Sequence, residues 1–162
     1  VEFNSLSKTA NMAGWRVGMA VGNAGALASL AQVKSNVDSG MFRPLQEAAI
    51  RALSVDPEWL AARNGIYRER LDIVLEGARA AGLRALRPRA TLYVWAEILR
   101  RDRGRDPSDR TSEEFALELL QRTGVSVVPG SFFGPAGEGY VRISVTAPTA
   151  RIREAMQRLR HF

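Results

Sequence analysis

The sequence predicts a mixed α/β fold whose second half is an α+β lobe and whose first part completes a larger domain. From about Leu83 onward, the expected order of elements is strand, helix, strand, strand, helix. This order is typical of a small sheet with helices packed on one face. The first ~50 residues are too few for a domain of their own. Because the chain starts at Val1, without Met and inside an expected strand, we expect it to be a piece of a longer protein.

Two strands and two helices are expected before the lobe. Val1–Leu6 and Trp15–Val21 have the residue pattern of paired strands on either side of a turn. Ala26–Val33 has the pattern of a short helix, and Asn36–Gly40 has the composition of a loop. A second helix is expected over residues 42–53, because apolar residues recur there at helical spacing.

A long helix is expected to follow. Asp56 is suited to the N-cap and Pro57 to the first helical position, and the apolar stripe continues to about Ala81. At ~25 residues this helix is long for a globular protein, so we expect it to bridge two lobes. The predicted domains are therefore residues 1–54, the end of a large domain, and residues 55–162, the long helix with a small α/β lobe.

The lobe itself is predicted from alternation and capping signals. Thr91–Ile98 is expected to be a strand with Tyr93 and Trp95 on one face, packed in the core or between lobes. Thr111 begins a capping box, and the helix that follows should end near Gly124. The remaining expected elements are a charge-dense solvated loop, two strands and a last helix: Arg100–Arg110, Val125–Val128, Tyr140–Val145 and Pro148–Leu159.

Composition excludes several classes of function. The chain has no Cys and one His, His161, so a thiol nucleophile, a His-based triad and a metal site are not expected. No apolar run approaches the ~20 residues that span a membrane, and no signal peptide is visible, so we expect a cytoplasmic protein. The net charge is +6, but the charges are interspersed, and we expect no binding to nucleic acid.

Lysine is rare in this chain, and one lysine lies in an unusual setting. Of the 23 basic Lys and Arg residues, only Lys8 and Lys34 are lysines. Arg does not lose its proton in a protein, whereas Lys can act as a nucleophilic amine. Lys8 is therefore a candidate for Schiff-base chemistry, although counting alone leaves open that it is one of two stray lysines.

The residues around Lys8 favour a phosphorylated ligand. Ser5 and Ser7 offer hydroxyl groups on either side of the strand end, and Arg16 offers a planar fork suited to phosphate oxygens. Gly14 allows a sharp turn or a close backbone approach. Together a hydroxyl, a guanidinium and an amine can hold a phosphorylated aldehyde.

A second candidate site lies near the C-terminal end. Arg142 is expected on the face of its strand opposite the buried Val141 and Ile143. An exposed edge arginine would explain this position, but the preceding loop suggests a pocket wall. From Val125 to Val141 the chain contains no Arg, and five Gly or Pro residues surround Phe132 and Phe133.

Two motifs resemble the class I and II aminotransferases, pyridoxal-phosphate enzymes of fold type I. The first is the run from Ser5 to Gly18, and the second is the pair of runs Val128–Gly134 and Gly137–Ser144. The stretch Asn36–Ile50 also looks like this family, so the resemblance covers nearly the whole chain. It implies the end of the large domain, a long bridging helix and a small C-terminal lobe.

The resemblance also implies roles for single residues. Lys8 would form the Schiff base with pyridoxal 5'-phosphate, Ser5 and Arg16 would bind its phosphate with Ser7 beside them, and Arg142 would bind the substrate α-carboxylate. The other residues that hold the cofactor in this family lie before the lysine, and this chain begins after them.

The implied activity is transamination between an amino acid and a 2-oxo acid, in a homodimer. The details look most like the branch that acts on diaminopimelate or its N-acyl forms, or on alanine and aspartate-like acids. Three alternatives stay open: a lyase or decarboxylase on the same scaffold, an aminotransferase-like sensing domain of a transcription regulator, and an inactive truncated module.

Overall fold

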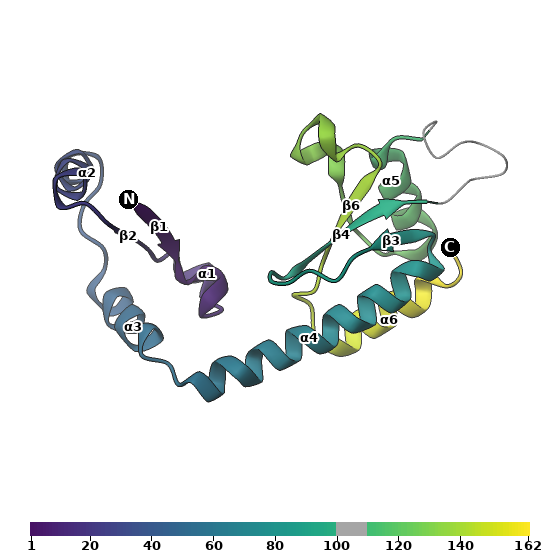
Figure 1. Ribbon diagram of the computed structural model, residues 1–162, viewed down its shortest axis with the longest axis horizontal. Coiled ribbons are helices and arrows are strands. Elements are labelled where there is room, and N and C mark those ends of the chain that lie inside the picture. Colours follow the sequence, from purple (N-terminus) through teal and green to yellow (C-terminus); the bar gives the residue numbers. More distant parts are fainter. Residues whose placement is uncertain (100–109) are drawn as a thin grey trace. The chain divides into compact units, whose positions relative to one another are not determined.

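The chain forms two compact units in a computed structural model that describes residues 1–99 and 110–162 (Figure 1). The units are Val1–Leu60 and Ala61–Phe162, and the division between them falls inside the long helix α4, Pro57–Ala80. Helix α4 begins at Pro57, as predicted. The Asp56 side chain caps it by accepting a hydrogen bond from the backbone N–H of Glu58 at 2.7 Å. The domain division after residue 54 stays a prediction. Most of the expected charge-dense loop lies outside the described residues.

The first unit begins with a β-hairpin, as predicted. Its strands β1 and β2 pair antiparallel, with Ser5 opposite Gly18. Both strands are shorter than expected: α1 begins at Leu6 after the first, and a 3₁₀ turn and the left-handed residue Arg16 precede the second. The elements of the hairpin are β1 (Glu2–Ser5), α1 (Leu6–Thr9), η1 (Ala13–Trp15) and β2 (Gly18–Val21).

Two helices complete the first unit, α2 (Ala24–Val37) and α3 (Arg43–Leu53). Helix α2 is longer than predicted because Asn23 caps it and accepts a hydrogen bond from the backbone N–H of Ala26 at 3.1 Å. Helix α3 packs its apolar stripe on the turn of the hairpin. The contacts join buried hairpin residues to partly buried helix residues: Leu6, Met12, Val17, Leu45, Ala48, Ala49 and Ala52.

The second unit contains a four-stranded antiparallel sheet in the order β3-β4-β6-β5 (Figure 1). In the central pair, Trp95 lies opposite Arg142. The last strand in this order, β5, shares only Val128 with the predicted strand Val125–Val128, because the residues that pair with β6 are Val128 and Pro129. The strands are β3 (Leu83–Ala85), β4 (Tyr93–Ile98), β5 (Val128–Pro129) and β6 (Tyr140–Ser144).

Three helices cover one face of this sheet, which confirms the predicted α+β lobe. They are the second part of α4, α5 (Ser112–Thr123) and α6 (Thr149–Leu159). Helix α6 runs alongside α4 (Figure 1), and the two approach so closely that a Cβ added to Gly77 would lie 2.6 Å from the Cβ of Met156. The core side chains of the central strands alternate, as predicted for a sheet with one buried face: Val94, Ala96, Ile98, Val141, Ile143 and Val145.

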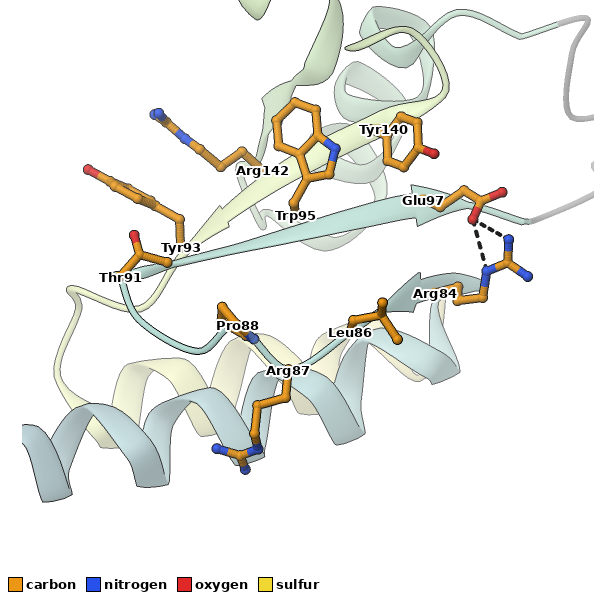
Figure 2. Close-up of a pocket in the computed structure, with 10 residues that line it drawn as sticks. All are labelled: Arg84, Leu86, Arg87, Pro88, Thr91, Tyr93, Trp95, Glu97, Tyr140 and Arg142. Atoms are coloured by element: carbon orange, nitrogen blue, oxygen red, sulfur yellow. Dashed lines mark hydrogen bonds and ion pairs between the residues drawn. The ribbon is translucent and has the colours of Figure 1, made fainter. Parts of the chain in front are cut away.

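The other face of the sheet is not part of this core. Tyr93, Trp95, Tyr140 and Arg142 project from it on the same side (Figure 2). Trp95 is 41% exposed, so it does not pack in the core of this unit, and the alternative of packing between lobes stays a prediction. Alternation along β4 turns Val94 and Ala96 to the helices and therefore turns Trp95 away from them.

Two short 3₁₀ turns connect β5 to β6, namely η3 (Gly130–Phe133) and η4 (Pro135–Gly137). Their backbones touch: a Cβ added to Gly130 would lie 2.0 Å from the carbonyl oxygen of Gly137. Glycine is therefore required at both positions, and the loop Gly130–Glu138 is compact.

Candidate functional site

Ser5 ends β1 and begins the short helix that carries Lys8. Its backbone is extended, and its Oγ accepts a hydrogen bond from the backbone N–H of Ser7 at 3.1 Å, as an N-cap does. Lys8 is the third residue of α1, and its side chain is exposed. The cap thus fixes the direction of the helix that presents the amine, while Leu6 anchors the same helix in the apolar cluster.

The pairing of β1 with β2 brings Arg16 near Ser5. Ser5 Oγ donates to Ser7 Oγ at 3.0 Å and lies 3.4 Å from the carbonyl oxygen of Val17, the residue after Arg16. The backbone N–H of Leu6 donates to the same carbonyl at 3.2 Å. Residues eleven positions apart in the sequence are therefore neighbours at this end of the hairpin.

Arg16 has a backbone conformation that a non-glycine residue rarely adopts, with φ 54° and ψ 45°. Its guanidinium donates through Nη1 to the carbonyl oxygen of Ala13 at 3.0 Å, and the residue is exposed. Arg16 also borders a hollow of about 660 Å³ in the first unit, together with Lys34, Ser35 and Phe42. Strained residues of this kind persist where the surrounding structure imposes them, often at ligand sites.

The donors on the hairpin fit a phosphate group. The Ser5 and Ser7 hydroxyls and the backbone of Arg16 lie at one end of it, the Arg16 guanidinium bonds to Ala13, and Lys8 follows in α1. The hydrogen bond to Ala13 uses one of the five N–H groups of Arg16, whereas a phosphate takes two in a fork. The types of donor on this hairpin therefore fit a phosphate, and their joint use for pyridoxal phosphate stays a prediction.

Arg142 lies in the second unit, in the middle of β6, and is half-buried. Its guanidinium carbon is 4.4 Å from the centre of the Tyr93 ring and 4.5 Å from that of the Phe133 ring. Its Nε is buried and has no hydrogen-bond acceptor within the described part of the chain. Arg142 is therefore a cation held by aromatic rings instead of by a carboxylate of the second unit.

The open face of the sheet forms a hollow of about 750 Å³ around Arg142 (Figure 2). Trp95 stacks on Tyr140 in this hollow, with ring centres 5.7 Å apart. Two other arginines line it, but Arg84 is paired with Glu97 and Arg87 with Asp72. Arg142 is thus the lining arginine that is suited to an incoming carboxylate.

The predicted site residues fall into two groups. The hairpin brings together Ser5, Ser7, Lys8 and Arg16, and Arg142 lies in the other unit. The expectation of a pocket wall after residue 128 agrees with the position of Phe133, whose ring lies near Arg142. Sequence reasoning missed Tyr93, although its place two residues before Trp95 on the same strand face was a usable signal.

Glu138 ends the Gly130–Glu138 loop and accepts a hydrogen bond from the backbone N–H of Ser112 at 2.5 Å. This bond holds the pKa of the carboxyl below its ordinary value; burial opposes the effect, and the backbone N–H of Gly139 adds to it.

Among residues 1–99 and 110–162, no cluster of three or more acidic or His side chains could hold a metal ion. No helix in the same ranges has the length and apolar character needed to cross a membrane.

Solved structures with this fold define the class of protein. The chain is similar to BacF from Bacillus subtilis, with a TM-score of 0.85 and 38% identity over 98% of this chain and 39% of that one. It is also similar to an aromatic aminotransferase from Pyrococcus horikoshii, with a TM-score of 0.86 and 30% identity over 98% of this chain and 41% of that one. The fold is thus that of part of a pyridoxal-phosphate-dependent aminotransferase.

Residues 1–159 match a model of the family described as aminotransferase class I and II, and the chain belongs to this family. It is 49% identical over 160 residues to the LL-diaminopimelate aminotransferase of Syntrophobacter fumaroxidans. The match covers 99% of this chain and 39% of that protein, so the chain spans well under half the length of the curated relatives that it matches.

Proposed function

We propose that this chain supplies the catalytic lysine and the carboxylate-binding arginine of an aminotransferase that exchanges an amino acid with a 2-oxo acid. The observation that supports the proposal is the end of the hairpin, where Ser5 lies beside Val17, the residue after Arg16, and begins the short helix that contains Lys8. An anion site beside an amine is the arrangement that a phosphorylated aldehyde requires.

In this proposal Lys8 has two tasks in succession, and each of the other residues has one. Ser5, Ser7 and Arg16 bind the phosphate of pyridoxal phosphate, and Lys8 holds the cofactor through its Nζ. When bound, the cofactor supplies the electron sink for the substrate α-carbon. Once the substrate amine has replaced it on the cofactor, the freed Lys8 Nζ would move the proton at that carbon, and Arg142 would orient the substrate through its carboxylate.

The relatives suggest which amino acid is used. The proteins named LL-diaminopimelate aminotransferase are 49% and 47% identical to this chain over nearly all of its length. We therefore propose LL-diaminopimelate, or an amino acid of similar charge, as the amino donor. The homodimer and the cytoplasmic location stay predictions from the sequence.

The two lysines allow a matched test of the role of Lys8. Lys34 lies on α2, is paired with Asp38 and borders the same hollow as Arg16, so Lys34→Ala removes a nearby lysine to which no cofactor role is assigned. The protein at its full natural length is mixed with pyridoxal phosphate, reduced with borohydride and digested. The masses of its peptides are then measured by mass spectrometry. We expect the cofactor mass on the Lys8 peptide in the parent and in Lys34→Ala, and no such mass in Lys8→Ala.

Amino transfer from LL-diaminopimelate to a 2-oxo acid is measured on the same proteins. Lys8→Ala should lower the rate by about 10²- to 10⁴-fold, the range for a lost acid–base group, and Lys34→Ala should leave it unchanged. Cofactor attached to Lys34, or equal rates in both variants, would remove Lys8 from the mechanism. Release of the amino group without a 2-oxo acid would favour a lyase.

A further inference from the structure

Arg142 carries an unusual combination of burial and missing hydrogen bonds. Its Nε is shielded from solvent, yet no acceptor for it lies within the described residues. A buried donor without an acceptor is unfavourable, and a long side chain gains rotational freedom by leaving such a position. Something other than a hydrogen bond at Nε must therefore hold the guanidinium where it is.

Two aromatic rings from separate elements supply that interaction. Tyr93 comes from β4 and Phe133 from η3, and their ring centres lie 4.4 Å and 4.5 Å from the guanidinium carbon. Both distances are well inside the ~6 Å range of a cation–π contact. Rings over the guanidinium leave its in-plane N–H groups as the ones that can donate to a ligand.

Phe133 is itself fixed on two sides. Trp95 meets it edge to face, with ring centres 5.6 Å apart. The loop that carries it is fastened to the start of α5, because the backbone N–H of Ser131 donates to Ser112 Oγ at 3.3 Å and Ser112 Oγ donates to Ser131 Oγ at 3.1 Å. Ser112 is fully buried, so this attachment is rigid.

We propose that Tyr93 and Phe133 are positioning residues that hold Arg142 ready for the substrate carboxylate. This inference rests on the role of Arg142 in the proposed function and adds the side chains that orient it. A guanidinium already held in its binding orientation loses less freedom when the carboxylate arrives, so binding is tighter.

The test compares variants that keep or remove an aromatic ring. Phe133→Leu and Tyr93→Leu remove the cation–π contact, whereas Tyr93→Phe keeps it. Phe132→Leu is the matched control, because Phe132 is the neighbour of Phe133 and is 67% exposed. The protein is used at its full natural length with pyridoxal phosphate bound, and the probe is 2-oxoglutarate, titrated by calorimetry.

We expect Phe133→Leu and Tyr93→Leu each to weaken 2-oxoglutarate binding about tenfold. Tyr93→Phe and Phe132→Leu should bind it within twofold of the parent, and the affinity for pyridoxal phosphate should be the same in all four variants. In an Arg142→Ala background, Phe133→Leu should cause no further loss, because its effect acts through the guanidinium.

Three kinds of result would overturn the inference, and they can be told apart. Normal 2-oxoglutarate binding in both leucine variants, with binding lost in Arg142→Ala, would contradict the positioning role alone. Normal binding in Arg142→Ala, or no binding to the parent, would contradict the proposed role of Arg142 and the inference with it. A loss in Phe133→Leu that persists in the Arg142→Ala background would show a general structural role instead.

Discussion

Arg16 combines a strained backbone with an exposed cationic side chain. Its φ of 54° belongs to the left-handed region, which costs a non-glycine residue about 1–2 kcal/mol. A residue kept only for stability would be glycine at this position. The conflict between backbone and side chain is therefore expected where the guanidinium is needed for binding.

Replacing Arg16 with glycine should separate stability from binding. In Arg16→Gly the backbone strain disappears, which stabilises the folded state. The greater conformational freedom of glycine in the unfolded chain offsets about 0.5–1 kcal/mol of this stabilisation. We expect the free energy of unfolding without cofactor, measured in urea, to stay within about 1 kcal/mol of the parent or to increase. The affinity for pyridoxal phosphate should fall at least tenfold, because a charge-assisted hydrogen bond contributes about 1.5–3 kcal/mol.

Asn11→Gly provides the control for this variant. Asn11 has a φ of 55° in the same connection between β1 and β2, but it brings no positive charge. We expect its cofactor affinity to equal that of the parent. If Arg16→Gly instead destabilised the protein by several kcal/mol with unchanged cofactor affinity, Arg16 would be a structural residue.

At the scale of elements, the Gly130–Glu138 loop depends on the first turn of α5. Glu138 accepts the backbone N–H of Ser112 there, and the buried Ser112 side chain holds Ser131. The first backbone N–H groups of a helix have no partner within it, so a carboxylate near them is favourable. One ionisable group thus secures the end of the loop that carries Phe133.

The pKa of Glu138 is lowered from its ordinary value of 4.5, so its contribution to stability should depend on pH in one direction. The contribution is fully present above the pKa of the unfolded state and is lost as the pH falls through the lower pKa of the folded state. Glu138→Gln should therefore be less stable than the parent at neutral pH, and the difference should shrink as the pH falls below 4.5. Urea unfolding at several pH values measures this, and a difference independent of pH would contradict it.

The sequence predicted the ends of a helix best where capping residues mark them. The capping box is present as expected, since Thr111 and Glu114 hydrogen-bond to each other's backbone N–H groups and Gly124 ends the helix with a φ of 69°. Helix α2 begins two residues before the predicted Ala26, because Asn23 is its N-cap. Caps are local, and a single residue is enough to decide where a helix begins.

Contacts that depend on strand register were harder to predict from the sequence. The group formed by Ser5, Lys8 and Arg16 lies within one hairpin, so a motif in the sequence can imply it. The contact between Tyr93 and Arg142 requires β4 and β6 to pair, and these strands are more than forty residues apart. A shift of one residue in that pairing would turn the side chains of a strand to the opposite face, and the sequence alone does not fix it.

For the molecule as a whole, the apolar core is unequally divided. The second unit contains nineteen buried hydrophobic residues among those described, and the first contains three. Many large apolar side chains of the first unit are exposed, including Phe3, Val37 and Phe42 at 69–78%. Burial of apolar surface is the main term that offsets the conformational entropy of folding, so the two units should differ greatly in autonomous stability.

Separate expression of residues 55–162 and 1–54 should reveal this difference. We expect the longer piece to unfold cooperatively in urea, with a free energy of unfolding within about 1–2 kcal/mol of the whole chain, because it retains the sheet and its three helices. The shorter piece should be largely unfolded, since a hairpin with so small a core is marginal in water. Fluorescence reports on each piece, as Trp15 lies in one and Trp59 and Trp95 lie in the other. Cooperative unfolding of residues 1–54 alone, or failure of residues 55–162 to fold, would show that the first unit supplies stability that its buried residues do not explain.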